Sequence, residues 1–307
     1  MSIHSSFLRY FDEVCKSSSI RKAAAQLHVA SSAVNRQILK VEDELGTKLF
    51  ERSYDGIKLT EAGQLLAQHV SRTLHDADRT LREIDASISG TVGGLKFVSQ
   101  GSVISRLLPP VLMRLYEEYP NTATSFIATG GKGLHKLVQN GSADIALIFD
   151  YKAEPGIELV DQISLPVGAV MAADHPLAMS ELQQISMQAC AEYSVILPDE
   201  SWPLRDRLNR ELSHTTIDSE TAASSNSIEF LRAMLTEKKV VGFQTIIGLE
   251  EVLEEGSLVH IPLVSAEGGA VTQTLSVTLN ENRQDSVFMD RALCLLRERL
   301  REYAMAE

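Results

Sequence analysis

A cluster of polar side chains between residues 31 and 40 has the types and spacing needed to bind nucleic acid. If this stretch is helical, its members share one side of the helix because residues three and four apart are neighbours there. Asparagine can bind adenine through two hydrogen bonds, serine can bond to base edges, and arginine and lysine bind phosphates or guanine. The candidate DNA-binding residues in this cluster are Ser31, Ser32, Asn35, Arg36 and Lys40.

A helix that carries these residues needs a buried side and a supporting partner. The opposite side has apolar residues at 4-3-4 spacing, which places them on one face: Val34, Ile38, Val41 and Leu45. A shorter helical segment precedes it, the turn is His28-Val29-Ala30, and Ser31 and Ser32 are the expected N-caps. Two helices arranged in this way indicate a helix-turn-helix DNA reader, although an amphipathic hairpin with a solvated face has the same pattern.

The next segments predict a β-hairpin and a long helix. Residues 49–52 and 57–59 are β-prone and flank an Asp55-Gly56 turn, so they indicate a wing beside the reading helix, with Arg52 in it. Thr60 is the expected cap of a helix that continues to about Ser89. Its apolar residues have a 3.5-residue repeat, which favours pairing with a second chain over packing on its own domain: Val70, Leu74, Ala77, Leu81, Ile84 and Ile88.

These segments resemble the LysR-type transcriptional regulators. The match is dense over about sixty residues, with Phe7 and Phe11 in the first helix, followed by Ala23-Ala24, Gln26-Leu27, Ser32-Ala33-Val34, Gln37-Ile38, Val41-Glu42, Leu45-Gly46, Leu49-Phe50-Glu51-Arg52 and Leu59-Thr60-Glu61-Ala62-Gly63. The resemblance implies a winged helix-turn-helix that binds double-stranded operator DNA, with Arg52 near the DNA backbone. It also implies a homodimer or dimer of dimers (a homotetramer), with RNA polymerase as a further partner.

Two positions depart from the family pattern. Many relatives have glutamine at position 31 and serine at position 35, whereas this chain has Ser31 and Asn35. Because asparagine can bind adenine through two hydrogen bonds, the preferred operator is expected to differ from the usual one.

From Leu95 onward the chain alternates between strand-like and helix-like segments. Such alternation predicts an α/β fold with a mainly parallel sheet. The layout again resembles the LysR effector domain, which is similar to the bilobed periplasmic solute-binding proteins. The expected domains are therefore a winged helix-turn-helix at 1–59, a linker helix at 60–90 and a bilobed effector domain at 91–307. Its first lobe would comprise about 91–162 and 266–307, and its second about 163–265.

Four short polar loops follow predicted strands or precede predicted helices in this α/β region. In open α/β sheets ligands bind beyond the carboxyl ends of the strands, although a single loop of this kind is more often an ordinary helix cap or turn. The resemblance implies that the loops converge on a cleft between the lobes that takes a small carboxylate or another polar metabolite. No arginine or lysine lies inside the four loops, and Arg106 and Lys132 lie near them, so the loops alone do not indicate a strongly anionic effector. The candidate effector-binding residues are Ser99, Gly101, Ser102, Thr129, Gly130, Ser225, Asn226 and Phe243.

Composition and charge narrow the function further. The 307-residue chain has a formal charge of −12, but residues 1–65 contain nine basic and eight acidic residues, so the excess acidity lies outside the predicted DNA reader. We find no apolar run long enough for a membrane span, no secretion signal, and no cysteine pair with metal or redox spacing, which indicates a cytoplasmic protein without metal or cofactor. Recognisable catalytic signatures are absent, which argues against an enzyme. A solute-binding protein or an enzyme that uses the bilobed domain remains the alternative.

Overall fold

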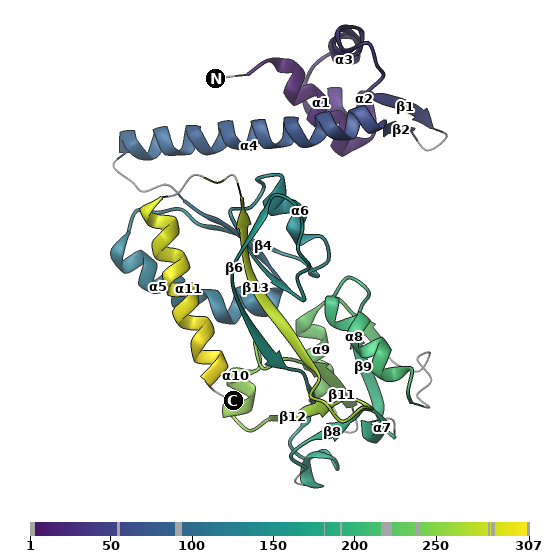
Figure 1. Cartoon of the computed structure of the whole chain (residues 1–307), viewed down its shortest axis with the longest axis vertical. Helices are drawn as coiled ribbons and strands as arrows, with labels where there is room; N and C mark the ends of the chain where they lie inside the picture. The colour runs from purple at the N-terminus through teal and green to yellow at the C-terminus, as the bar shows by residue number, and fades with distance from the viewer. Residues whose placement is uncertain are drawn as a thin grey trace. The chain divides into compact units, whose positions relative to one another are not determined.

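The computed structural model describes residues 4–53, 56–89, 94–180, 182–190, 192–215, 223–236, 240–281, 283 and 286–305. The chain divides into two compact units, one comprising Met1–Thr91 with Asn140–Ser142 and the other Val92–Gln139 with Ala143–Glu307. Figure 1 labels the helices and strands of both units. None of the described helices is long and apolar enough to cross a lipid bilayer.

The first unit is a helical cluster with a β-hairpin. Its elements are α1 (Ser6–Ser17), α2 (Ile20–Gln26), α3 (Ser31–Leu45), β1 (Phe50–Ser53), β2 (Gly56–Leu59) and α4 (Glu61–Ser89). The strands β1 and β2 pair in antiparallel register, with Phe50 opposite Leu59. A single apolar cluster joins all three N-terminal helices to the hairpin and to the start of α4, and its buried members are Phe7, Phe11, Val14, Ala23, Ala24, Val34, Ile38, Leu49 and Val70.

The details of α3 correct two expectations from the sequence. Ala30 is the N-cap, without a side-chain hydrogen bond, so Ser31 and Ser32 lie inside the first turn instead of capping it. Leu45, expected in the core, is 54 % exposed. The last turn of α3 extends past the apolar cluster, where Leu49 of the following segment takes the interior position.

The long helix α4 begins as the sequence predicts. The Thr60 hydroxyl accepts a hydrogen bond from Gly63 N–H at 3.0 Å and donates one to the Lys48 carbonyl at 2.7 Å. These two bonds fix the first turn of α4 against the segment that leads into the hairpin. A Cβ at Gly63 would collide with the Leu49 carbonyl, so glycine allows the close approach of the two segments.

The predicted self-pairing residues of α4 fall into two groups. Val70 is buried in the apolar cluster of its own unit, and Leu74 packs against the same cluster. Ala77 is buried and Leu81 is half-buried. Ile84 and Ile88, in the second half of the helix, are 48 % and 80 % exposed. The first half of the repeat thus serves the chain's own fold, and the exposed apolar side chains are at the far end.

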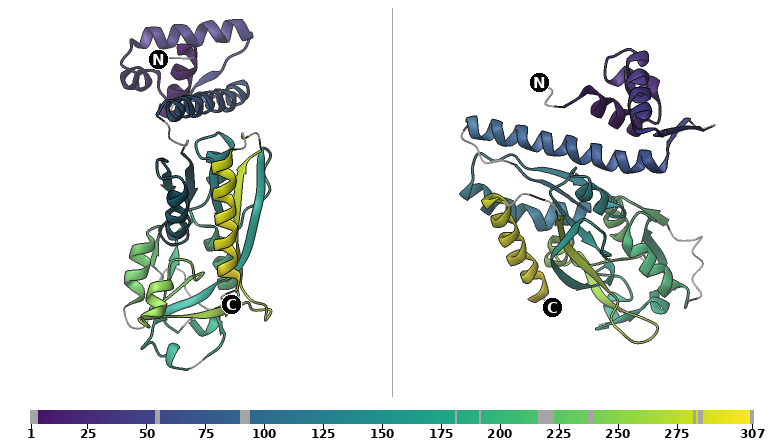
Figure 2. Two further views of the ribbon diagram at one scale, coloured as in Figure 1. Left: turned by 90° about the vertical axis from the view of Figure 1, so that its left-hand side faces the viewer. Right: turned by 45° about the horizontal axis from the view of Figure 1, so that its top comes forward.

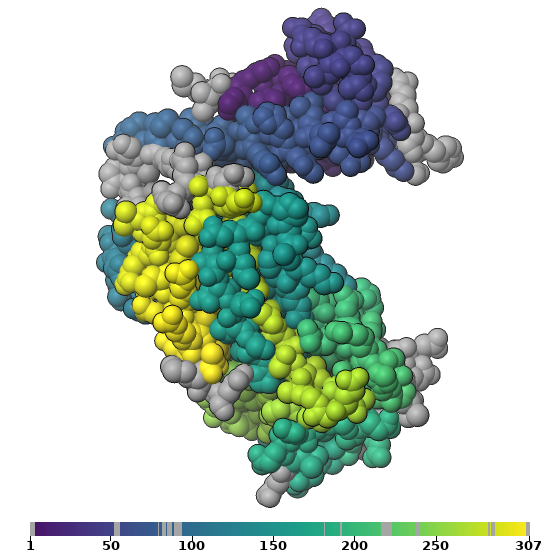
Figure 3. Space-filling view, in the orientation of Figure 1, coloured from purple at the N-terminus to yellow at the C-terminus, as the bar shows by residue number. Residues whose placement is uncertain are grey.

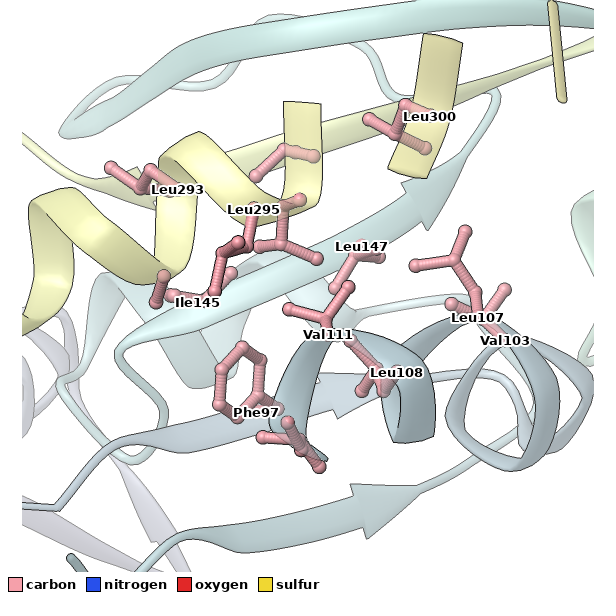
Figure 4. Close-up of a cluster of buried hydrophobic side chains, with 14 of the residues drawn as sticks. Phe97, Val103, Leu107, Leu108, Val111, Ile145, Leu147, Leu293, Leu295 and Leu300 are labelled. Carbon is pink, nitrogen blue, oxygen red and sulfur yellow. The ribbon is translucent and has the colours of Figure 1, made fainter. Parts of the chain in front are cut away.

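The first sheet of the second unit has five strands in the order β4-β3-β5-β13-β6. The strands are β3 (Lys96–Ser99), β4 (Ser125–Ala128), β5 (Ile145–Phe149), β6 (Ile157–Pro166) and β13 (Thr272–Asn280). One face packs on the π-helix η1 (Val103–Leu107), α5 (Leu108–Glu118) and α11 (Val287–Met305), and the other packs on α6 (Leu134–Gln139). Figure 4 shows the cluster that joins η1, α5 and α11 to β3 and β5.

The second sheet has six strands in the order β10-β9-β11-β7-β12-β8. They are β7 (Gly168–Ala172), β8 (Ile185–Ser186), β9 (Ser194–Pro198), β10 (Ala223–Ser225), β11 (Val240–Gln244) and β12 (Leu258–Val264). The helix α8 (Pro203–Leu212) packs on one face, and α9 (Ile228–Leu235) and α10 (Glu250–Glu254) cover the other. Two short helical turns complete this lobe, η2 (Ala178–Ser180) and α7 (Met187–Cys190).

The chain passes between the sheets twice, from β6 to β7 and from β12 to β13. These passages run in opposite directions, so β13 pairs antiparallel with both β5 and β6, and β7 pairs antiparallel with both β11 and β12. The sheets are therefore mixed, and the expectation of a mainly parallel sheet was wrong for the crossing strands. Figure 2 shows β13 and α11 running beside each other in this unit, and Figure 3 shows α11, in yellow, on its surface.

Candidate DNA interface and effector cleft

The polar side of α3 is exposed to solvent. Ser31, Ser32, Asn35, Arg36 and Lys40 are all exposed. Within the described residues, the side chains of Asn35 and Arg36 form no hydrogen bond or ion pair. Lys40 has one partner, the exposed Glu44 carboxylate at 3.7 Å, and such a surface pair contributes little stability. The donors and acceptors of this side are therefore available to an external partner.

Four of these residues, all except Ser31, line a groove on the surface of this unit. The groove is open to solvent and is lined by Ser32, Asn35, Arg36, Leu39, Lys40, Glu42, Asp43, Gly46, Thr47 and Lys48. It carries side chains that can bond to base edges beside side chains that can bind phosphates, a combination typical of the reading helix in helix-turn-helix proteins. Of the predicted DNA-binding residues, only the side chain of Arg52 lies outside the described residues, as does the predicted wing tip Tyr54-Asp55.

One of the residues that line this groove, Glu42, is a buried carboxylate whose structural role was not predicted from the sequence. Glu42 is only 6 % exposed. Its Oε1 accepts hydrogen bonds from Leu49 N–H at 2.8 Å and Phe50 N–H at 3.3 Å, and its Oε2 accepts one from Lys48 Nζ at 2.9 Å. Burial raises the pKa of Glu42, but these three hydrogen bonds outweigh it and hold the pKa below its ordinary value. The carboxylate thus ties the start of the hairpin to the back of α3.

In the second unit, the carboxyl ends of strands from the two sheets face each other. The loop after β4 contacts the loop after β9: Lys132 N–H donates to the Ser201 carbonyl at 3.0 Å, and a Cβ at Gly130 would collide with the Ser201 hydroxyl. The loop after β3 approaches α9, since a Cβ at Gly101 would lie 3.8 Å from Ile228 Cγ2. This edge-to-edge arrangement is where open α/β proteins bind ligands.

The predicted effector residues of the first lobe have different surroundings. The Ser99 hydroxyl donates to the Leu147 carbonyl at 2.8 Å, so it bridges two strands of the sheet. Ser102 is buried against the second lobe, where a Cβ at Gly248 would lie 3.0 Å from Ser102 Cβ. Thr129 is exposed, and its N–H donates to the Ser99 carbonyl at 3.1 Å. Ser102, Gly101 and Gly130 are the members that touch the facing lobe.

The predicted residues of the second lobe also differ in position. The Ser225 hydroxyl accepts a hydrogen bond from Ser227 N–H at 3.1 Å, and Asn226 is exposed. Ser227 is the N-cap of α9 and accepts a bond from Phe230 N–H. The Phe243 side chain is buried in the apolar cluster that packs on α8, so its ring serves the core of this lobe.

Several further residues at the facing edges were not among the candidate effector-binding residues, although three of them lie in the four polar loops. Gln100 is buried, and its Nε2 donates to the Gly130 carbonyl at 3.0 Å. Trp202, Gln244 and Thr245 are also buried. A usable signal was present in the sequence, since each of these residues either follows a strand directly or lies within four residues of its end.

The cations at the facing edges are paired with carboxylates. Lys132 Nζ lies 3.0 Å from Asp206 Oδ1, and Arg207 Nη2 lies 3.1 Å from Asp150 Oδ1. Arg106 forms a bidentate salt bridge with Glu251. Two of these pairs link residues of α8 to the first lobe. Across the described part of the chain there is no group of three or more His, Cys, Asp or Glu residues that could hold a metal ion.

Comparison with known families gives two matches that together span nearly the whole chain. Residues 6–64 match the model described as bacterial regulatory helix-turn-helix protein, lysR family. Residues 89–301 match the LysR substrate binding domain. The second match alone covers more than half of the sequence.

Individual relatives agree with these matches. The chain is 27 % identical over 289 residues to a probable RuBisCO transcriptional regulator from Porphyra purpurea, covering 91 % of this chain and 88 % of that protein. A full-length OxyR variant from Pseudomonas aeruginosa has a similar structure, with a TM-score of 0.65 at 21 % identity, covering 98 % of this chain and 95 % of the other. Full-length CbnR complexed with its target DNA gives a TM-score of 0.63 at 19 % identity, covering 96 % and 99 %.

Proposed function

The chain belongs to the LysR family of bacterial transcription regulators, and on that basis we propose how it binds DNA and responds to a small molecule. Family membership makes it a DNA-binding regulator with an effector-binding domain and not an enzyme. In our proposal α3 lies in the major groove of operator DNA, and a small carboxylate or another polar metabolite binds between the two lobes.

The uncommitted polar side of α3 is the observation that carries the DNA half of the proposal. Asn35 and Arg36 are exposed and have no partner within the described residues, while the other side of the same helix is buried. We assign Asn35 to adenine and Arg36 to guanine or a phosphate, with Ser31, Ser32 and Lys40 beside them. Arg52 is assigned to the DNA backbone on the family pattern alone.

A regulator of this kind works best as a pair of chains. Two chains joined through α4 would place two copies of α3 on two half-sites of an operator, which doubles the contacts and raises affinity. We propose a homodimer as the minimum and a dimer of dimers as the full assembly, in line with the family. Contact with RNA polymerase would then convert an effector-dependent change into a change in transcription.

The test is binding of the purified full-length protein to DNA from upstream of its own gene. Fluorescence anisotropy over a salt series would compare this duplex with a random duplex of equal length. We expect selective binding whose affinity falls steeply with salt, since each phosphate contact adds roughly 0.9 to the slope of log K against log salt. Equal affinity for both duplexes, together with no enrichment of any genomic fragment, would contradict the proposal.

A further inference from the structure

An exposed leucine lies in the middle of the polar side of α3. Leu39 is 47 % exposed. Its neighbours on this side of the helix, Asn35, Arg36 and Lys40, are polar and exposed, and they line the same groove as Leu39. Within the described residues, Leu39 is not one of the side chains that form or pack against the apolar cluster of its unit. The apolar surface of Leu39 therefore faces solvent in the groove.

The helical spacing places Leu39 at the centre of this side. Residues three and four apart are neighbours on a helix, so Leu39 follows Arg36 and Asn35 at the next turn. These two residues follow Ser32 in the same way. One turn beyond Leu39 is Asp43, an exposed carboxylate that DNA phosphates would repel. Leu39 is thus the last position on this side before the helix becomes acidic.

The major groove of DNA presents one apolar group, the C5 methyl of thymine, beside the donors and acceptors of the base edges. We have assigned Asn35 to adenine, which pairs with thymine. A helix rises about 1.5 Å per residue, so Leu39 lies about 6 Å farther along α3 than Asn35. Successive bases are about 3.4 Å apart along a DNA strand. With α3 lying along the groove, a thymine methyl within about two base pairs of that adenine is in reach of Leu39.

An exposed leucine on a protein surface needs no explanation by itself. Leu39 differs from a scattered surface leucine because it shares a groove with side chains that can bond to base edges. Contact with a thymine methyl would remove apolar surface of both groups from water, which corresponds to about fourfold in affinity for each methyl group that is buried. Cytosine has a hydrogen in place of this methyl group, so the contact also distinguishes thymine from cytosine.

We propose that Leu39 is a specificity-determining residue of the DNA interface and that it contacts the methyl group of a thymine in the major groove. This inference rests on the proposed function. It adds to the hydrogen bonds assigned to Asn35 and Arg36 a base that is read through an apolar contact.

Replacing thymine by deoxyuridine in the operator tests the contact, because the replacement removes the methyl group and leaves the hydrogen-bonding atoms unchanged. Fluorescence anisotropy with the full-length protein would compare the duplex that the wild type selects with the same duplex carrying deoxyuridine at every thymine. We expect the deoxyuridine duplex to bind about fourfold or more weakly. Equal affinity for the two duplexes would overturn the proposal.

Variants of α3 then test whether this effect depends on Leu39. Leu39→Ala should reduce the ratio of the two dissociation constants to below about twofold, whereas Leu39→Met retains a long apolar side chain and should keep most of the ratio. Leu45→Ala is the matched control, since Leu45 is 54 % exposed on the same helix but lies outside the described lining of the groove. An undiminished ratio in Leu39→Ala would overturn the proposal.

The wild-type measurements separate this inference from the proposed function. If the wild type selects a duplex but binds its thymine and deoxyuridine forms equally, the role of Leu39 is wrong and the regulator assignment stands. If the wild type selects no duplex, the proposed function fails and the assignment of Leu39 fails with it.

Discussion

The polar side chains of α3 have two different roles, one in stability and one in recognition. The buried Glu42 side chain makes three hydrogen bonds, whereas the exposed side chains of Asn35 and Arg36 make none within the described residues. The first residue stabilises the unit and the other two are free for recognition. Substitutions on the two sides of this helix should therefore separate stability from DNA affinity.

Glu42→Ala should loosen the start of the hairpin. The variant leaves the N–H groups of Leu49 and Phe50 without their acceptor, and we expect these amides to lose about 1–3 kcal/mol of protection. Glu42→Gln retains an acceptor and should lose less. Hydrogen exchange of the peptide that spans these residues measures the effect, and Glu44→Ala, which removes an exposed carboxylate, is the control. Unchanged protection in Glu42→Ala would contradict the role given to this carboxylate.

The pH dependence of the same contact has a defined sign. The pKa of Glu42 is lower in the folded protein than its ordinary value of 4.5. The stabilisation is therefore fully present above about pH 4.5 and is lost as the pH falls through the folded-state value. The difference in protection between wild type and Glu42→Gln should shrink over that acidic range. A difference that persists undiminished at pH 3 would contradict this assignment.

Among the elements, α4 serves two purposes along its length. Its first half is part of the apolar cluster of its own unit through Val70 and Leu74. Its second half exposes Ile84 and Ile88, and side chains of this kind in regular spacing favour association with another helix. The 3.5-residue repeat alone does not separate these purposes, since both bury apolar residues at the same spacing.

Replacing the two exposed isoleucines should weaken self-association. We expect the Ile84→Asp, Ile88→Asp double variant to raise the dimer dissociation constant by more than about tenfold, since each isoleucine buried in an interface contributes roughly 1.5–3 kcal/mol. Sedimentation over a range of concentrations measures this. Leu65→Asp, at an exposed leucine outside the repeat of the same helix, is the control. Association equal to the wild type in the double variant would place the dimer interface elsewhere.

For the whole molecule, sequence patterns predicted the order and approximate position of the elements well. The α3 face, the cap at Thr60 and the alternation of strands and helices after Leu95 follow from periodicity and turn residues, whereas β6, β8 and β10 were not predicted as strands. The role of Glu42 could not be predicted this way, because its partners lie beyond the end of the helix and the residue looks like part of a solvated acidic run. Leu45 was misplaced for the complementary reason, since periodicity does not show where a core ends.

The cleft was only partly predictable. Loops after strands were recognisable one by one, but which loops meet depends on the two strand crossings, and these also produced the mixed sheets. The meeting of Gly130 with Ser201 and of Ser102 with Gly248 joins positions about 70 and 145 residues apart, respectively. Sequence spacing therefore identified Ser102 and Gly130 without identifying Gly248 and Ser201 as their counterparts.

The central claim is that the exposed side of α3 binds the operator, and one comparison tests it most directly. Fluorescence anisotropy would measure the affinity of wild type, Arg36→Ala and Arg210→Ala for the same operator duplex at one salt concentration. Both variants remove one exposed arginine, but Arg210 is on α8 of the other unit. We predict that Arg36→Ala weakens specific binding by about 1–3 kcal/mol and that Arg210→Ala binds like the wild type. Wild-type affinity in Arg36→Ala would contradict the claim.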